Sequence, residues 1–151
     1  MDTQDIIDTL NDLIETCKDG EYGFRSCAEH ARSTTLKTLL NRHADECRQG
    51  AAELQALVAQ RGGRAEEGGS ASGALHRGWV SLKGTLAGHS DVAMLEEVER
   101  GEDVAIERYR DVLQRATLPA DLLAVVQRQY DGLKRNHVEM RSLRDQARAA
   151  G

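Results

Sequence analysis

Apolar residues recur at alternating spacings of about four and three over most of the chain, the spacing of long amphipathic helices. In the first part of the chain this stripe is interrupted at residues 33–35, which read Ser-Thr-Thr, and it ends at the pair Gly62 and Gly63. Glycine suits the residue that closes a helix. The pattern therefore predicts a helical hairpin over residues 2–61. Its stripe contains Leu10, Ile14, Cys17, Glu21, Phe24 and Ala28, then Leu36, Leu40, His43, Cys47, Leu54 and Leu57.

The same spacing returns later and predicts a second hairpin over residues 90–148. The break comes at residues 117–119, where Pro119 suits the first turn of the next helix. The tail beyond Leu143 is rich in arginine and alanine, and we expect it to fray. The stripe contains Leu95, Glu99, Glu102, Ile106, Tyr109 and Leu113, then Leu123, Val126, Tyr130, Leu133, His137 and Met140.

Residues 62–89 form a crossover that is too long for a tight turn between helices. They contain 8 of the 14 glycines, and apolar residues around Trp79 follow helical spacing, which predicts a short helix within the crossover. Two antiparallel hairpins joined by one long crossover are typical of ferritin-like bundles. The sequence thus predicts an all-α, ferritin-like four-helix bundle that forms a single domain over residues 1–151.

Composition narrows the range of functions. The chain has 151 residues with 40% hydrophobic content, enough for one core, and its net charge of −5 disfavours nucleic-acid binding. No apolar run is long enough to cross a membrane, and the acidic start MDTQDIID is unlike a secretory signal, so we expect a soluble, cytoplasmic protein. Three cysteines without CxxC spacing predict buried free thiols rather than disulfides. Neither a phosphate-binding loop nor a GxSxG motif appears.

Polar residues interrupt the apolar stripes near the middle of each expected helix. Glu21, Glu102 and His137 take inward positions, and Glu46 lies beside the stripe of its helix. Residues equidistant from a hairpin turn face each other across it. This places Glu21 opposite Glu46, and Glu102 opposite His137.

These four residues suggest a metal site. An unpaired carboxylate between apolar layers costs several kcal/mol, so it must be protonated, ion-paired or bound to a cation. Carboxylates and imidazole suit iron, manganese or zinc, and nothing in the sequence indicates an organic cofactor. We therefore predict that Glu21, Glu46, Glu102 and His137 bind a metal ion, which leaves enzymatic activity open. Glu99, His43 and Gln49 are the expected neighbours.

A non-catalytic alternative remains open as well. Two-metal bundles carry Glu-x-x-His on two helices, whereas residues 46–49 read ECRQ and residues 134–137 read KRNH. Lys134 could instead neutralise Glu102 or Glu46 in a structural or partner-binding protein whose buried glutamates pair with lysine or arginine. Ile7, Leu13 and Leu39 are expected on the exterior, where apolar side chains favour a homodimer.

The chain resembles the PA2169-type (DUF2383) family of bacterial ferritin-like four-helix bundles, whose function is unknown and which is often associated with stress responses. The resemblance is carried by LNDLIETCKDGEYGF, HADECRQGAAEL, SASGALHRGWVSLKG, LEEVERGEDVAIERY and LKRNHVEMRSLRD, and it covers nearly the whole chain. It implies the ferritin-like fold and metal binding. Glu21, Glu46 and Glu102 match the inward glutamates of the family.

Overall fold

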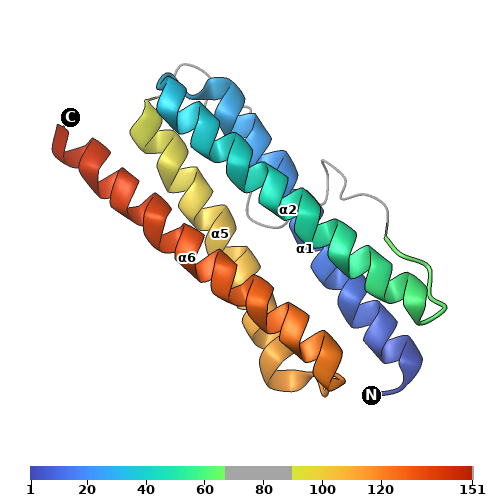
Figure 1. The fold of residues 1–151 in the computed structure, drawn as a ribbon. Helices are drawn as coiled ribbons and strands as arrows, with labels where there is room; N and C mark the ends of the chain where they lie inside the picture. Colours follow the sequence, from blue (N-terminus) through green and yellow to red (C-terminus); the bar gives the residue numbers. More distant parts are fainter. Residues whose placement is uncertain (67–89, 151) are drawn as a thin grey trace.

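The computed structural model describes residues 1–66 and 90–150, and in these ranges it contains four helices and no strands. They are α1 (Thr3–His30), α2 (Thr34–Gln60), α5 (Asp91–Arg115) and α6 (Ala120–Ala150), shown in Figure 1. The prediction of an all-α four-helix bundle is confirmed. The short helix expected around Trp79 lies outside the described residues.

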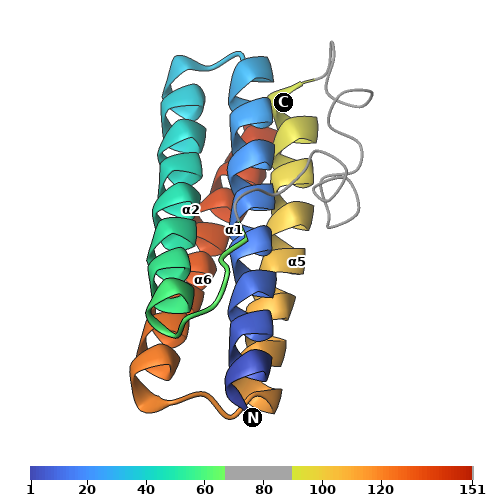
Figure 2. The same cartoon turned by 90° about the vertical axis from the view of Figure 1, so that its right-hand side faces the viewer.

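The helices form two antiparallel hairpins, α1 with α2 and α5 with α6 (Figures 1 and 2). α1 packs against both α2 and α5, whereas α2 and α6 share few contacts. The end of α2 and the start of α5 lie at opposite ends of the bundle (Figure 2). The chain therefore passes from one end of the bundle to the other between the two hairpins.

The turn between α1 and α2 lies earlier in the chain than the sequence pattern suggests, because α1 ends at His30. The Ser33 hydroxyl accepts a hydrogen bond from the Leu36 amide and caps the N-terminus of α2, so the helix already begins at Thr34. The carboxylate of Asp91 accepts hydrogen bonds from the backbone amides of Arg32 and Ser33. These bonds tie the turn of the first hairpin to the start of α5.

The last helix is longer than expected. Instead of fraying, the tail stays helical through Ala150, because Leu143 and Ala147 pack against the core and Arg148 pairs with Glu96 of α5 at 3.3 Å. Pro119 lies just before the helix rather than in its first turn, and its carbonyl accepts from the Leu123 amide. None of the helices in the described ranges is long and apolar enough to cross a membrane.

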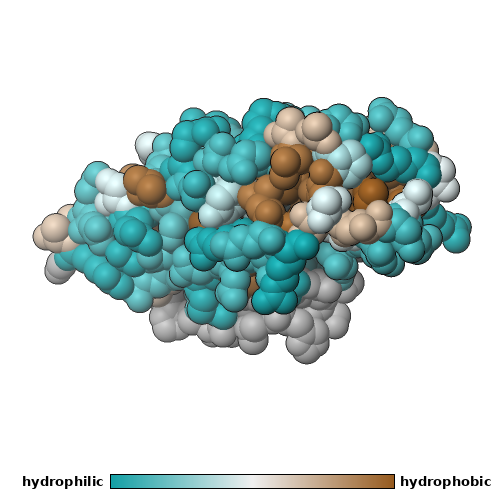
Figure 3. Space-filling view, turned by 90° about the horizontal axis from the view of Figure 1, so that it is seen from below, coloured by the Kyte–Doolittle hydropathy of each residue, from teal (hydrophilic) through white to brown (hydrophobic). Residues whose placement is uncertain are grey.

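The core consists of two apolar clusters, one towards each end of the bundle. The first surrounds Phe24, Leu40 and Met140, and the second surrounds Leu10, Leu54 and Val126. Figure 3 shows that an apolar area also reaches the surface on one face, with hydrophilic side chains around it.

The expectation that Ile7 and Leu13 lie on the exterior is wrong. Both belong to the second cluster, with exposed fractions of 7% and 1%, and Leu39 is half-buried against the first. The reason is that α1 contacts two helices and therefore buries a wider face than one stripe.

Gly62 closes α2 in a conformation that only glycine adopts freely. Its φ is +74°, and the amides of Gly62 and Gly63 donate to the carbonyls of Ala59 and Val58. We expect Gly62→Ala to lower the free energy of unfolding by about 1 kcal/mol, because a Cβ is strained in the left-handed region.

Urea unfolding measures this change. Gly132→Ala is the control, because this glycine lies inside α6 with ordinary helical backbone, and a Cβ there meets its nearest atom, on Arg135, at 3.6 Å. It should be neutral or stabilising by up to about 1 kcal/mol. Equal effects of the two substitutions would contradict the role of the turn.

Candidate functional site

A cavity of about 520 Å³ lies in the middle of the bundle, and all four described helices line it. Each contributes one glycine: Gly20, Gly50, Gly101 and Gly132. A glycine inside a helix is less stable than alanine by about 0.5–1 kcal/mol, so the glycines that leave room for the cavity lower the stability of the four helices. Its other lining residues include Cys17, Phe24, Glu46, Cys47, Gln49, Glu53, Glu102, Tyr109, Arg128, Gln129, Arg135 and Asn136.

Glu102, which lines this cavity, faces His137, as their register predicts. The Nδ1 atom of His137 lies 3.2 Å from Oε1 of Glu102, and the two residues are 7% and 3% exposed. Glu102 follows the cavity-lining Gly101 on α5, and His137 comes from the middle of α6. The structure therefore holds a buried carboxylate–imidazole pair between its two apolar clusters.

Burial shifts the titration of Glu102 towards neutral pH, and pairing raises the pKa of His137. Desolvation raises the pKa of Glu102 to about 7, although the hydrogen bond with His137 acts in the opposite direction. The same hydrogen bond raises the pKa of His137, against the effect of its own burial. The pair can thus gain or lose a proton under physiological conditions.

The other ring nitrogen of His137 also has partners. Nε2 lies 3.1 Å from a carboxylate oxygen of Asp103 and 3.0 Å from a guanidinium nitrogen of Arg141. Nε2 cannot donate to Asp103 and accept from Arg141 at once. When the ring is charged it donates to Glu102 and Asp103, and Arg141 then acts only as a nearby positive charge that lowers the pKa of His137.

Glu21 and Glu46 have other partners. Glu46 is 47% exposed at its side chain, lies 3.9 Å from Arg42, and accepts a 2.8 Å hydrogen bond from Asn136 of α6. Glu21 pairs with Arg25 at 3.7 Å and is not among the residues that line the cavity. Within residues 1–66 and 90–150, no three His, Cys, Asp or Glu side chains gather where they could hold a metal ion. The role of Glu21, Glu46, Glu102 and His137 as a ligand set stays a prediction.

The expected neighbours are divided between the cavity and the rest of the bundle. Gln49 lines the cavity, whereas Glu99 is held by Arg141 at 3.4 Å and by Arg144. His43 is fully buried. Its Nε2 lies 3.0 Å from Glu139, and its ring meets that of Phe24 edge-on with centroids 5.3 Å apart.

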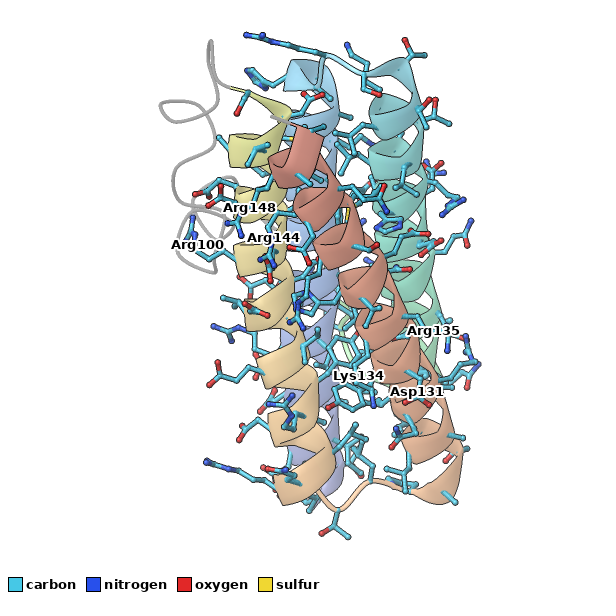
Figure 4. The ribbon with its side chains drawn as sticks, turned by 90° about the vertical axis from the view of Figure 1, so that its left-hand side faces the viewer. Arg100, Asp131, Lys134, Arg135, Arg144 and Arg148 are labelled. Atoms are coloured by element: carbon cyan, nitrogen blue, oxygen red, sulfur yellow. The ribbon has the colours of Figure 1, made fainter. Side chains whose placement is uncertain are left out.

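Lys134 is not the counter-ion of Glu102 or Glu46, contrary to the sequence-based expectation. It lies on the surface of α6, 3.6 Å from Asp131 and over the ring of Tyr130 (Figure 4). Its position on the helix turns it away from the cavity. Arginines pair with the glutamates instead: Arg25 with Glu21, Arg42 with Glu46, and Arg141 and Arg144 with Glu99.

Sequence reasoning missed a chain of polar contacts along the cavity wall. The Cys17 thiol lies 3.1 Å from the Tyr109 hydroxyl, which donates a 2.7 Å hydrogen bond to Gln129. Gln129 in turn donates to Glu53 at 2.9 Å and to the carbonyl of Gly50 at 3.2 Å. One signal was present in the sequence, because Gly50 on an apolar stripe leaves room for a side chain from a neighbouring helix.

The Glu102–His137 pair fits part of a metal site. Two ligands that each lie about 2.1 Å from a metal are about 3.0 Å apart at a right angle and about 3.4 Å apart at the tetrahedral angle. The observed 3.2 Å lies between these values. Asp103 at the opposite ring nitrogen resembles the carboxylate partner that metal-binding histidines commonly have. The pair supplies two ligands, so water or Glu46 would have to complete the site.

Comparison with known proteins confirms the family that the sequence resembles. The family described as Domain of unknown function (DUF2383) matches residues 5–115, which cover α2, α5 and all but the first two residues of α1. No curated protein matches the chain. Because the match spans well over half of its length, the chain belongs to the DUF2383 family.

Proposed function

We propose that the bundle binds one divalent transition-metal ion at the Glu102–His137 pair. The observation that carries the proposal is the geometry of the pair: a buried carboxylate oxygen 3.2 Å from Nδ1 of an imidazole whose other nitrogen meets Asp103. Glu46 lines the same cavity and is the residue we propose as a third ligand. Glu21 pairs with Arg25 and is not among the residues that line the cavity, so it is left out of the proposed centre.

Iron is the ion we propose first, with manganese and zinc as the ions to compare. Carboxylate and imidazole ligands suit both ferrous and ferric iron, so a bound ion would supply redox chemistry. The protein positions the ligands and shields the ion: Asp103 orients His137, and the apolar clusters limit the access of water. We propose iron-linked stress protection by a single, weakly bound ion as the biological role.

Metal titration of protein freed of metal by chelation tests this proposal. Ferrous iron under anaerobic conditions, and separately Mn²⁺ and Zn²⁺, should bind with one ion per chain. Glu102→Gln and His137→Ala should each weaken binding by more than about 100-fold, because even the partners of metal ligands contribute about 10- to 100-fold. Affinity should also fall as the pH is lowered through the raised pKa of His137, since only the neutral ring is a ligand.

Glu107→Gln is the matched control, because this glutamate is exposed on the same helix. Its titration should equal that of the wild type. Equal titrations of the wild type and Glu102→Gln would refute the site. One bound iron ion without consumption of oxygen or peroxide would keep the site and exclude an oxidase.

A non-catalytic structural or partner-binding role is the second candidate, and the arginine pairs of Glu21, Glu46 and Glu99 favour it. In that case Glu102 is neutralised by His137 and by its raised pKa rather than by a metal. The outcome that distinguishes the candidates is metal content: this role predicts no stoichiometric metal after purification without a chelator.

We also propose that the protein is a cytoplasmic homodimer. The support for a dimer is the apolar area on the face seen in Figure 3. In the described ranges, Leu123 and Val138 are large apolar side chains that are 41% and 65% exposed. Sedimentation of the purified chain gives the mass directly.

A further inference from the structure

Two thiols that the proposed metal site does not use face the same cavity. Cys17 of α1 and Cys47 of α2 are free cysteines and both line the cavity, whereas the third cysteine, Cys27, is buried outside it. We propose that Cys17 and Cys47 form a dithiol site for a soft monovalent metal ion, of which cuprous copper is the biological member and silver the stable probe.

The two thiols lie in a reciprocal arrangement against glycines of the facing helix. A Cβ on Gly20 would meet the Cys47 sulfur at 3.0 Å, and a Cβ on Gly50 would meet the Cys17 sulfur at 3.5 Å. Each sulfur therefore reaches across the space between α1 and α2. Because each glycine is three residues from the cysteine of its own helix, the sulfurs are offset along the bundle by about 4.5 Å.

The offset of about 4.5 Å runs along the helices and by itself exceeds the length of a disulfide bond, whereas a bridging ion can span it. Thiolate sulfurs bind metals at about 2.3 Å, so one ion between them spans about 4.6 Å. A disulfide bond needs its sulfurs about 2.05 Å apart, and one helix would have to move. Two soft thiolates satisfy a monovalent ion such as cuprous copper, whereas zinc takes four ligands.

Binding exchanges protons for the ion. Each thiol loses its proton to solvent and forms one sulfur–metal bond, no electron is transferred, and the product carries one net negative charge. Burial raises the pKa of Cys17 to about 11 and that of Cys47 well above its usual value, so both thiols stay neutral and poorly reactive without the ion. Tyr109 lies 3.1 Å from the Cys17 sulfur and can turn its single hydroxyl proton from Gln129 to Cys17 once Cys17 is a thiolate. Arg128 and Arg135 line the same cavity.

Silver titration of the reduced, metal-free protein tests the proposal. A hundredfold excess of a monothiol such as N-acetylcysteine removes silver from single thiols. The wild type should retain one Ag⁺ per chain and release two protons for each ion bound. Cys17→Ala and Cys47→Ala should each lose retention under competition by about 100-fold or more, while Cys27→Ala, the matched control, should retain it.

Two glycine variants keep the test valid if a cysteine variant fails to fold. Gly20→Ala forces the Cys47 sulfur to move and should weaken retention, whereas Gly50→Ala makes only an ordinary contact with Cys17 and should weaken it less. Glu107→Gln, which is exposed on α5, should bind silver like the wild type. The proposal would be overturned if Cys17→Ala retained silver as well as the wild type does. It would also be overturned if mild peroxide treatment lowered the mass of the protein by 2 Da, the change expected when Cys17 and Cys47 form a disulfide.

Discussion

Glu102→Gln is expected to stabilise the protein increasingly as the pH rises, by about 3 kcal/mol more at pH 8 than at pH 4.5. Burial raises the pKa of Glu102 from its ordinary 4.5 to about 7, and each unit corresponds to about 1.4 kcal/mol. Between these values the folded protein keeps a proton that the unfolded chain has lost, so stability of the wild type falls as the pH rises. Glutamine has nearly the same shape and carries no charge at any pH.

His137 adds to the loss of wild-type stability with rising pH, whereas His43 opposes it. The raised pKa of His137 gives stability that is present at low pH and lost as the pH rises through that pKa. Burial lowers the pKa of His43, so its contribution is lost as the pH falls below about 6.5. Comparison of wild type and variant at each pH cancels the contribution of His43.

Urea unfolding at pH 4.5, 6, 7 and 8 measures the difference. Glu107→Gln on the exposed face of the same helix is the control, and its difference from the wild type should not change with pH. If the stability difference between Glu102→Gln and the wild type also did not change with pH, Glu102 would not be buried as a neutral acid. Saturation with a divalent ion should restore the stability of the wild type at pH 8, because binding only the folded state stabilises it.

Phe24→Ala is expected to lower the free energy of unfolding by about 3–5 kcal/mol, the usual cost of removing a buried aromatic ring. Phe24 is 4% exposed and belongs to the first apolar cluster. Its ring also lines the cavity and meets the ring of His43 at an interplanar angle of 79°. The substitution therefore enlarges an existing cavity and removes an edge-to-face contact.

Thermal and urea unfolding check this value against Phe24→Leu, which keeps most of the volume and should cost less than about 1.5 kcal/mol. A domain of this kind is stable by only about 5–15 kcal/mol, so Phe24→Ala removes a large share. A loss below about 1 kcal/mol would show that the ring is not part of the core. Far-UV circular dichroism confirms that both variants remain helical.

Much of the site could be read from the sequence because antiparallel hairpins impose a simple register. Residues equidistant from a turn meet, so Glu102 was placed opposite His137, and this contact is present. The same register relates Phe24 to His43 and Cys17 to Gly50, which also lie together. Register says at which height a residue lies. It does not say in which direction a long side chain turns.

Glu21 and Glu46 show this difference. Both lie near the expected height, but Glu46 takes a hydrogen bond from Asn136 of a different hairpin and Glu21 pairs with Arg25 within its own helix. A glutamate near the surface finds the nearest cation or amide donor at little cost. Lys134 likewise stays on the surface, next to Asp131. Burying its ammonium group beside a buried carboxylate would lose more free energy through desolvation than the ion pair would gain.

The apolar periodicity and the positions of glycine and proline by themselves determined the four helices and the breaks between them, because helices depend on local spacing. Register within a hairpin also determined the level at which buried polar residues meet. Only the tertiary structure decided how the hairpins dock. The packing of α1 against both α2 and α5 buries Ile7 and Leu13, and the sparse contact of α2 with α6 accompanies a cavity lined by a glycine from each helix. These features depend on the rotation of one hairpin against the other, which is set by the packing of side chains far apart in the sequence.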